Sequence, residues 1–274
     1  REKTNIKLGY LAKKDYVCEF NTVPLNKILT KSGTVQIYRA FYDDCLLNKI
    51  ENHVCKEKLV GGELGLAIGT NFYSDTKKRF KLLKGIDIDR WTIKETRFLA
   101  NEDKLNWQEA EKFLKPKVIG QRLIAHIENP VPHIRITACY DNEGTIITNT
   151  LTAFKLDNRI NELFWLGYLN STFVSWYAYN FIFSRAIRTM DLYNFYIQQL
   201  PLPALIVGNA NEQEPIIDLV KTILAITSEK DYLSNITKKD KVKDLEHQID
   251  QLVYQLYDLT PNEIAIVEGN NEKP

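Results

Sequence analysis

The most hydrophobic stretch of the chain reads ELFWLGYLNSTFVSWYAYNF over residues 162–181, with eight aromatic side chains and a single charge, Glu162. Its apolar positions recur in steps of three and four residues, which places one stripe on one face of a helix. Asn, Ser and Thr interrupt the run, whereas a membrane-spanning helix needs about 20 predominantly apolar residues. The pattern therefore predicts a helix of the protein core and no membrane segment.

Between Leu59 and Leu156 the pattern changes to short apolar runs separated by turn residues, which is typical of β-strands. The segment DNEG (141–144) has the chemistry of a hairpin loop, because Gly can adopt a left-handed backbone. We therefore expect residues 133–156 to form neighbouring antiparallel strands. The stretch GGELGLAIG (61–69) lacks the glycine spacing of phosphate-binding loops, and it predicts a turn that leads into a strand.

Helical spacing returns at both ends of the chain. The apolar positions from Ile37 to Ile50 predict an amphipathic helix, and the stripes at 216–226 and 245–256 predict a helical pair in the tail. The segment QQLPLP (198–203) should be extended because each Pro removes a backbone donor. TPNE (260–263) has the form of a capping box and predicts a short last helix. Together these elements predict an α+β fold, with an antiparallel-rich sheet, packed helices and a C-terminal helical pair.

The most informative feature of the composition is the uneven distribution of charge along the chain. The formal net charge of the 274 residues is only +1, but residues 208–274 hold 7 Lys and Arg against 13 Asp and Glu, so residues 1–207 carry +7. This asymmetry favours a molecule with two different faces. One face would bind a polyanion, and the other would be exposed to water or contact a protein. The cysteines and histidines show no zinc-site spacing, and reduced thiols in a cytoplasmic protein are expected. Because the chain begins REKTN without Met, we expect it to be part of a longer polypeptide.

One enzymatic interpretation rests on carboxylates. Asp87 or Asp89 followed by the segment EDK (102–104) imitates the acidic residues and Lys of metal-dependent nucleases, whose carboxylates hold a divalent ion. Such a match arises easily in a chain with 35 acidic and 36 basic residues. The segment ENPVP (128–132) lacks the aromatic residue and the adjacent prolines of an adenine-methyltransferase active site, and it is interpreted as an ordinary turn.

Basic residues give the more informative signal. Residues 77–90 carry six Lys and Arg, residues 112–135 carry five, and the segment RAIRT (185–189) directly follows the aromatic helix. Such runs can simply be a solvated face, but several phosphate contacts together release several counterions, which favours a groove for nucleic acid. The candidate DNA-binding residues are Lys77, Lys78, Arg79, Lys84, Arg90, Gln121, Arg122, His126, Arg185, Arg188 and Thr189.

The order of several segments resembles the TaqI-like C-terminal specificity domain of adenine-specific DNA methyltransferases and fused type II restriction-modification enzymes, and it is similar to the half-repeats of type I specificity subunits. The segments are FKLLKGIDIDRW, KFLKPKVIGQRL, ACYDNEGTI, ELFWLGYLNSTFVSWY, YIQQLPLP and IDQLVYQLYDLTPNEIAIVE, within roughly residues 58–268. The resemblance implies a target-recognition domain over 58–207, a connector or remnant of a preceding methyltransferase domain over 1–57, and a C-terminal helical segment over 208–274. It also implies that the aromatic helix is core, with its Asn-Ser pair as a fixed internal feature.

The function we expect is sequence-specific recognition of double-stranded DNA in the major groove, as a module of a restriction-modification enzyme. The resemblance places the chemistry, with S-adenosylmethionine as cofactor, in an upstream methyltransferase domain of the same polypeptide, so this chain should bind DNA and hold no catalytic residue, metal or cofactor. Two alternatives stay open, a metal-dependent nuclease domain and a helical protein-interaction module.

Overall fold

The structure is a computed structural model that describes residues 5–11, 18–29, 35, 39 and 44–269. Its first elements are a hairpin and two helices, namely β1 (Asn5–Leu11), β2 (Cys18–Pro24), α1 (Leu25–Ile28) and α2 (Asp44–His53). The helix predicted from Ile37 begins at Asp44, and Ile37 itself lies outside the described residues. Leu46, Leu47 and Ile50 of α2 are buried in the main core, so the apolar stripe faces the interior as expected.

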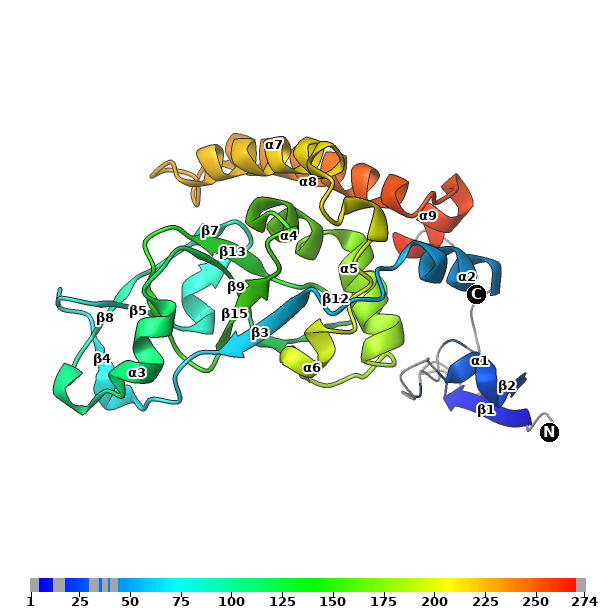
Figure 1. The fold of residues 1–274 in the computed structure, drawn as a ribbon, viewed down its shortest axis with the longest axis horizontal. Helices are drawn as coiled ribbons and strands as arrows, with labels where there is room; N and C mark the ends of the chain where they lie inside the picture. The colour runs from blue at the N-terminus through cyan, green and yellow to red at the C-terminus, as the bar shows by residue number, and fades with distance from the viewer. Residues whose placement is uncertain (1–4, 12–17, 30–34, 36–38, 40–43, 270–274) are drawn as a thin grey trace.

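A four-stranded antiparallel sheet forms the centre of the molecule (Figure 1). Its strands in spatial order are β13 (Ala138–Asp141), β9 (Lys117–Gln121), β15 (Leu151–Leu156) and β3 (Val60–Leu64). Four consecutive residues of β15, from Leu151 to Phe154, are buried, because helices cover one face of the sheet and a smaller apolar cluster lies on the other.

A second sheet of four short strands extends the molecule at one end (Figure 1). Its order is β14 (Ile146–Ile147), β5 (Lys81–Leu83), β8 (Arg97–Leu99) and β4 (Tyr73–Ser74), with α3 (Trp107–Ala110) nearby. Three two-stranded ladders complete the strands, namely β6 (Ile88–Asp89) with β7 (Thr92–Ile93), β10 (Leu123–Ile124) with β16 (Met190–Asp191), and β11 (His126–Ile127) with β12 (His133–Ile134).

The predicted hairpin around residues 141–144 is wrong. Gly144 has the expected positive φ of 71°, but the turn joins two different sheets. β13 pairs with β9, β14 pairs in parallel with β5, and β15 lies on the other side of β9 from β13. The strands at 133–156 are therefore not neighbours, because β9 lies between them and its Val118 and Ile119 fill the core there.

The expected turn at the glycine-rich stretch is also wrong at its start, because Gly61 and Gly62 lie within β3. A Cβ at Gly62 would collide with Ile197 Cδ1 and would lie 2.7 Å from Thr152 Cγ2. Ile197 ends the short helix α6 (Asn194–Ile197), whose Asn194 Oδ1 accepts a hydrogen bond from the Gly62 amide at 2.9 Å. The glycines thus allow α6 to lie directly on the strand.

The aromatic run forms two helices and a π-helical turn: α4 (Glu162–Leu169), α5 (Thr172–Tyr177) and residues Ala178–Ile182. The helix is interrupted at Asn170-Ser171. Asn170 Oδ1 accepts a hydrogen bond from the Ala138 amide and its Nδ2 donates to the Ala138 carbonyl, both at 3.0 Å. Ser171 caps α5 through the Val174 amide. The predicted core position and the fixed role of this Asn-Ser pair are therefore confirmed.

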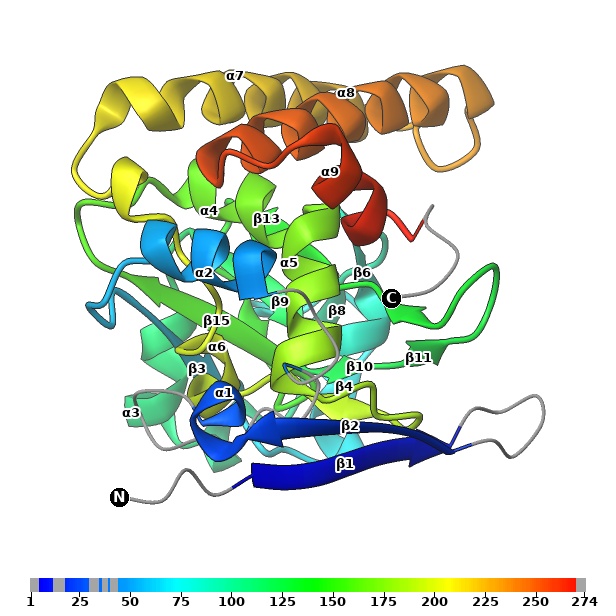
Figure 2. The same cartoon turned by 90° about the vertical axis from the view of Figure 1, so that its right-hand side faces the viewer.

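The tail forms an outer layer of helices over α4 and α5 (Figures 1 and 2). Its helices are α7 (Ala210–Thr227), α8 (Ile236–Leu256) and α9 (Pro261–Val267). The predicted helical pair and the capping box of Thr260 and Glu263 are present. The α+β expectation is confirmed, whereas the domain boundaries at 57 and 207 stay predictions. Within the described part of the chain, no helix has the length and apolar character needed to cross a membrane.

Candidate nucleic-acid interface

The loop between β4 and β5 carries three consecutive exposed positive charges. Lys77, Lys78 and Arg79 are all exposed, and the Arg79 guanidinium lies over the Phe80 ring, 4.8 Å from its centroid. This cation–π contact holds the Arg79 side chain against Phe80, where it lines one edge of the hollow described next.

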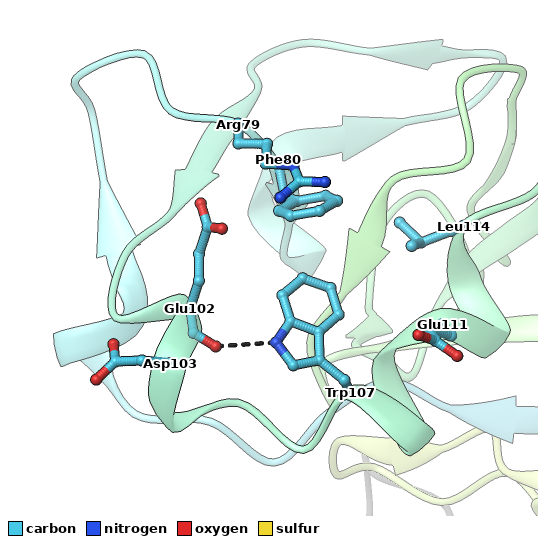
Figure 3. Close-up of a pocket in the computed structure, with 7 residues that line it drawn as sticks. All are labelled: Arg79, Phe80, Glu102, Asp103, Trp107, Glu111 and Leu114. Atoms are coloured by element: carbon cyan, nitrogen blue, oxygen red, sulfur yellow. Dashed lines mark hydrogen bonds between the residues drawn. The ribbon is translucent and has the colours of Figure 1, made fainter.

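A hollow of about 480 Å³ borders this loop (Figure 3). Phe80 and Trp107 form its aromatic part, with ring centroids 4.7 Å apart, and the Trp107 indole donates a hydrogen bond to the Glu102 carbonyl at 3.0 Å. The carboxylates of Glu102, Asp103 and Glu111 also line the hollow. Their negative charge opposes a phosphate there, so the loop above the hollow is the part suited to DNA.

Hydrogen bonds bring Lys84, Gln121 and Arg122 together around Thr150. Gln121 Nε2 donates to the carbonyl of Gly85, the neighbour of Lys84, at 2.8 Å. The Gly85 amide donates to Thr150 Oγ1 at 2.8 Å, and the Arg122 amide donates to the Thr150 carbonyl at 3.0 Å. The Lys84 ammonium lies 5.2 Å from the ring centroid of Tyr73 in β4, which links this group to the loop at 77–79.

The β10–β16 ladder adds the remaining candidates. Arg122 precedes β10, and its Nε lies 3.3 Å from the Asp191 carboxylate in β16. His126 Nε2 lies 3.2 Å from the Tyr179 hydroxyl, and Arg185 Nε donates to Asn180 at 2.7 Å. Tyr179 and Asn180 both belong to the π-helical turn at Ala178–Ile182. The two contacts therefore anchor the loop at 184–189 beside β10 and β11.

Arg188 and Thr189 are exposed at the end of that loop. Their side chains are therefore accessible to a partner, whereas Gln121, Arg122, His126 and Arg185 are only half-exposed. The structure thus gathers most of the candidates into one series of contacts that runs from Lys84 to the 184–189 loop.

Arg90 differs from the other candidates because its side chain is only 11% exposed and is held by the tail. Its Nε donates to the Ile136 carbonyl at 3.0 Å and its Nη1 to Glu246 of α8 at 3.3 Å. Burial lowers the pKa of Arg90 to about 10, and the nearby Arg135 adds to the effect, while Glu246 and Asp250 oppose it. Arg90 joins the sheet to the tail, and we leave it out of the proposed DNA surface.

Two of the carboxylates in the nuclease alternative have partners of their own, whereas those of Glu102 and Asp103 line the hollow described above. Asp87 is buried and accepts hydrogen bonds from the Lys84 amide at 3.0 Å and from Arg97 Nε at 3.2 Å. Asp89 Oδ1 accepts from the Arg90 amide at 2.8 Å. Across the residues described, no group of three or more His, Cys, Asp and Glu side chains could hold a metal ion.

Sequence comparison finds a family model that matches most of this site. Residues 80–202 match the model of the TaqI-like C-terminal specificity domain. This part of the chain is therefore similar to a TaqI-like specificity domain. The match confirms the expected resemblance to a specificity domain of restriction-modification systems, and it contains every candidate residue except Lys77, Lys78 and Arg79.

Two solved structures are similar to the chain at 12% sequence identity. The HsdS subunit from Thermoanaerobacter tengcongensis matches over 78% of this chain and 50% of its own, with a TM-score of 0.34. The type IIG restriction endonuclease BpuSI matches over 90% of this chain and 37% of its own, with a TM-score of 0.44. The chain thus spans half or less of the length of these proteins. No curated protein matches it in sequence.

Sequence reasoning did not select Tyr179 or Asp191, although both contact candidate residues. Tyr179 belongs to the aromatic run, whose pattern indicates only the core. Asp191 meets Arg122 through the β10–β16 ladder, and two strands of two residues each leave no detectable alternation in the sequence.

Proposed function

We propose that the chain recognises a specific sequence of double-stranded DNA in the major groove. The observation that carries the proposal is the specificity-domain match over 80–202, which contains the anchored basic residues from Lys84 to Arg188. Phosphate contacts position a protein on DNA, whereas contacts with base edges determine the sequence that it binds. The exposed loop with Lys77, Lys78 and Arg79 suits phosphates, and Arg122 and Arg188 suit base edges.

Whole-protein activity is a further part of the proposal. The chain acts as the target-recognition part of an adenine-specific DNA methyltransferase, and an upstream domain of the same polypeptide binds S-adenosylmethionine and methylates the adenine. The candidate residues of the chain include no methyl-transfer site. Calorimetry with S-adenosylmethionine tests this division, since binding of the cofactor to the chain itself at micromolar affinity would contradict it.

Selection from a pool of duplexes with a randomised central region tests the main proposal. The chain should enrich a defined sequence, and binding to that duplex is then titrated at several salt concentrations. The variant with Lys77, Lys78 and Arg79 replaced by Ala should bind all duplexes more weakly, with the salt slope reduced by about one unit for each phosphate that the variant no longer binds. The matched control replaces Lys239, Lys241 and Lys243, three exposed lysines of α8, and should bind as wild type does.

Single Arg variants separate base contacts from phosphate contacts. Arg188→Ala or Arg122→Ala should relax the preference at one base position by about 1–3 kcal/mol, with little change in salt slope. If the pool yields no enriched sequence, the chain does not recognise a DNA target. If the loop variant and the control weaken binding equally, the basic loop is only a solvated face.

A further inference from the structure

The loop at 184–189 holds an apolar side chain among its charges. Ile187 is 78% exposed, more than any other large hydrophobic residue that the structure describes. It lies between Arg185 and the exposed Arg188, in the segment SRAIRT. Single exposed apolar residues are common on protein surfaces, so exposure alone indicates no function. Ile187 differs from such residues because the loop that carries it is held in place at both ends.

Hydrogen bonds fix the loop at its start. The Arg185 amide donates to the Tyr179 carbonyl at 2.8 Å, and the Ala186 amide donates to the Phe183 carbonyl at 3.0 Å. Ser184 and Arg185 have φ values of 49° and 52°, a left-handed conformation that non-glycine residues rarely adopt. Such strain persists only where the surrounding structure determines it, and it is common at binding sites.

The loop is also fixed at its end. Met190 is buried and pairs with Ile124 in the β10–β16 ladder, beside Arg122. Ile187 is therefore displayed on a segment anchored on both sides, at the point where the basic candidates meet. Because the loop is already ordered, little conformational entropy would be lost when Ile187 contacts a partner.

The chemistry of the major groove then limits what Ile187 can contact. Arginines bind phosphates or guanine, but an aliphatic side chain can do neither. The C5-methyl of thymine is the apolar group on base edges in the major groove. We propose that Ile187 contacts the methyl group of a thymine in the target sequence and so helps to determine specificity. This inference rests on the proposed DNA recognition.

The test combines Ile187→Ala with duplexes that lack single methyl groups. The probe is the duplex enriched from the randomised pool by the wild-type chain, with each thymine replaced in turn by deoxyuridine. Loss of one buried methyl corresponds to about a fourfold increase in Kd. Wild type should lose about that factor at one thymine, and Ile187→Ala should weaken binding to the unmodified duplex but show no further loss at that thymine.

Ile236→Ala is the matched control, because Ile236 is 74% exposed at the start of α8 in the tail. It should bind every duplex as wild type does. The methyl contact is overturned if wild type tolerates every deoxyuridine, or if Ile187→Ala keeps the full penalty at the sensitive thymine. In either case the enrichment by wild type still stands, so failure of this inference is distinct from failure of DNA recognition.

Discussion

At the scale of single residues, Asn170 joins the break between α4 and α5 to the edge strand β13. Its amide satisfies both backbone groups of Ala138. The Ala138 carbonyl also accepts a hydrogen bond from the Trp91 amide at 3.0 Å. Asn170→Leu keeps the volume similar but leaves the Ala138 N–H unpaired in the core, which should lower the free energy of unfolding by about 1–3 kcal/mol. Urea unfolding measures the change, with Asn142→Leu in the exposed 141–144 turn as control. A loss below about 1 kcal/mol would show that water replaces the amide.

The environment of Asp250 leads to a prediction about how the stability of the fold depends on pH. Its carboxylate accepts hydrogen bonds from the amide and hydroxyl of Thr172, each at 2.7 Å. Burial raises the pKa of Asp250, although the Thr172 bonds and Arg90 oppose the shift. A carboxyl group with a raised pKa binds more protons in the folded state, so its contribution to stability grows as the pH falls through that pKa.

The matching experiment compares wild type with Asp250→Asn in urea at several pH values between 7 and 4. The difference in free energy of unfolding, wild type minus variant, should increase on acidification. Effects of the other carboxylates cancel in this difference. If the difference instead decreases, the Thr172 bonds hold the carboxylate ionised and outweigh its burial.

The candidate site shows what residue-level prediction could achieve. Lys77, Lys78 and Arg79 were selected by residue type and local charge, and the structure places them in an exposed loop, while their part in DNA binding stays a prediction. The same reasoning selected Arg90, whose partner Glu246 is 156 positions away in the sequence. No local pattern reveals such a pair, and only the packing of α8 on the sheet brings the two together.

At the scale of elements, prediction succeeded where the determining contacts are local. The capping box at the start of α9 involves Thr260 and Glu263 alone, so four residues contain the whole signal. The hairpin at 141–144 failed because the turn residues are compatible with two arrangements. The choice depends on β9, which precedes the turn and pairs with both β13 and β15.

The contact between α4 and α7 allows a sharper test of helix packing. A Cβ on Gly167 of α4 would lie 2.6 Å from Ile216 Cγ2 and 2.8 Å from Val220 Cγ2 of α7. Gly167→Ala favours the helix by up to about 1 kcal/mol through propensity but forces the helices apart, at a cost of about 1–3 kcal/mol. The variant should therefore be less stable than wild type in urea.

A double-mutant cycle with Val220→Ala checks the cause of that loss. Val220→Ala removes one of the two side chains that crowd the new methyl group, so the two losses should sum to more than the loss in the double variant. Additive losses, or a stabilising Gly167→Ala, would mean that α4 and α7 are not in close contact at this point.

At the scale of the whole molecule, the charge asymmetry of the sequence corresponds to two sides of the structure. Figures 1 and 2 place α7 and α8 beyond α4 and α5, on the side of the molecule away from β4 and β10. A layer of helices is about 10 Å thick, which exceeds the Debye length of about 8 Å at physiological salt. Acidic side chains on the outer surface of the tail should therefore have little effect on DNA bound at the basic loops.

Charge neutralisation on each side tests this orientation. The triple variant Glu214→Gln, Asp218→Asn and Asp240→Asn changes three exposed tail residues and should alter the Kd for the target duplex by less than about twofold at about 0.15 M salt. Asp191→Asn removes one charge 3.3 Å from Arg122 and should strengthen binding to all duplexes, because a negative charge beside the proposed interface repels the phosphates of any sequence. If the triple variant strengthens binding more than Asp191→Asn does, DNA lies against the tail helices and the interface proposed around β10 is wrong.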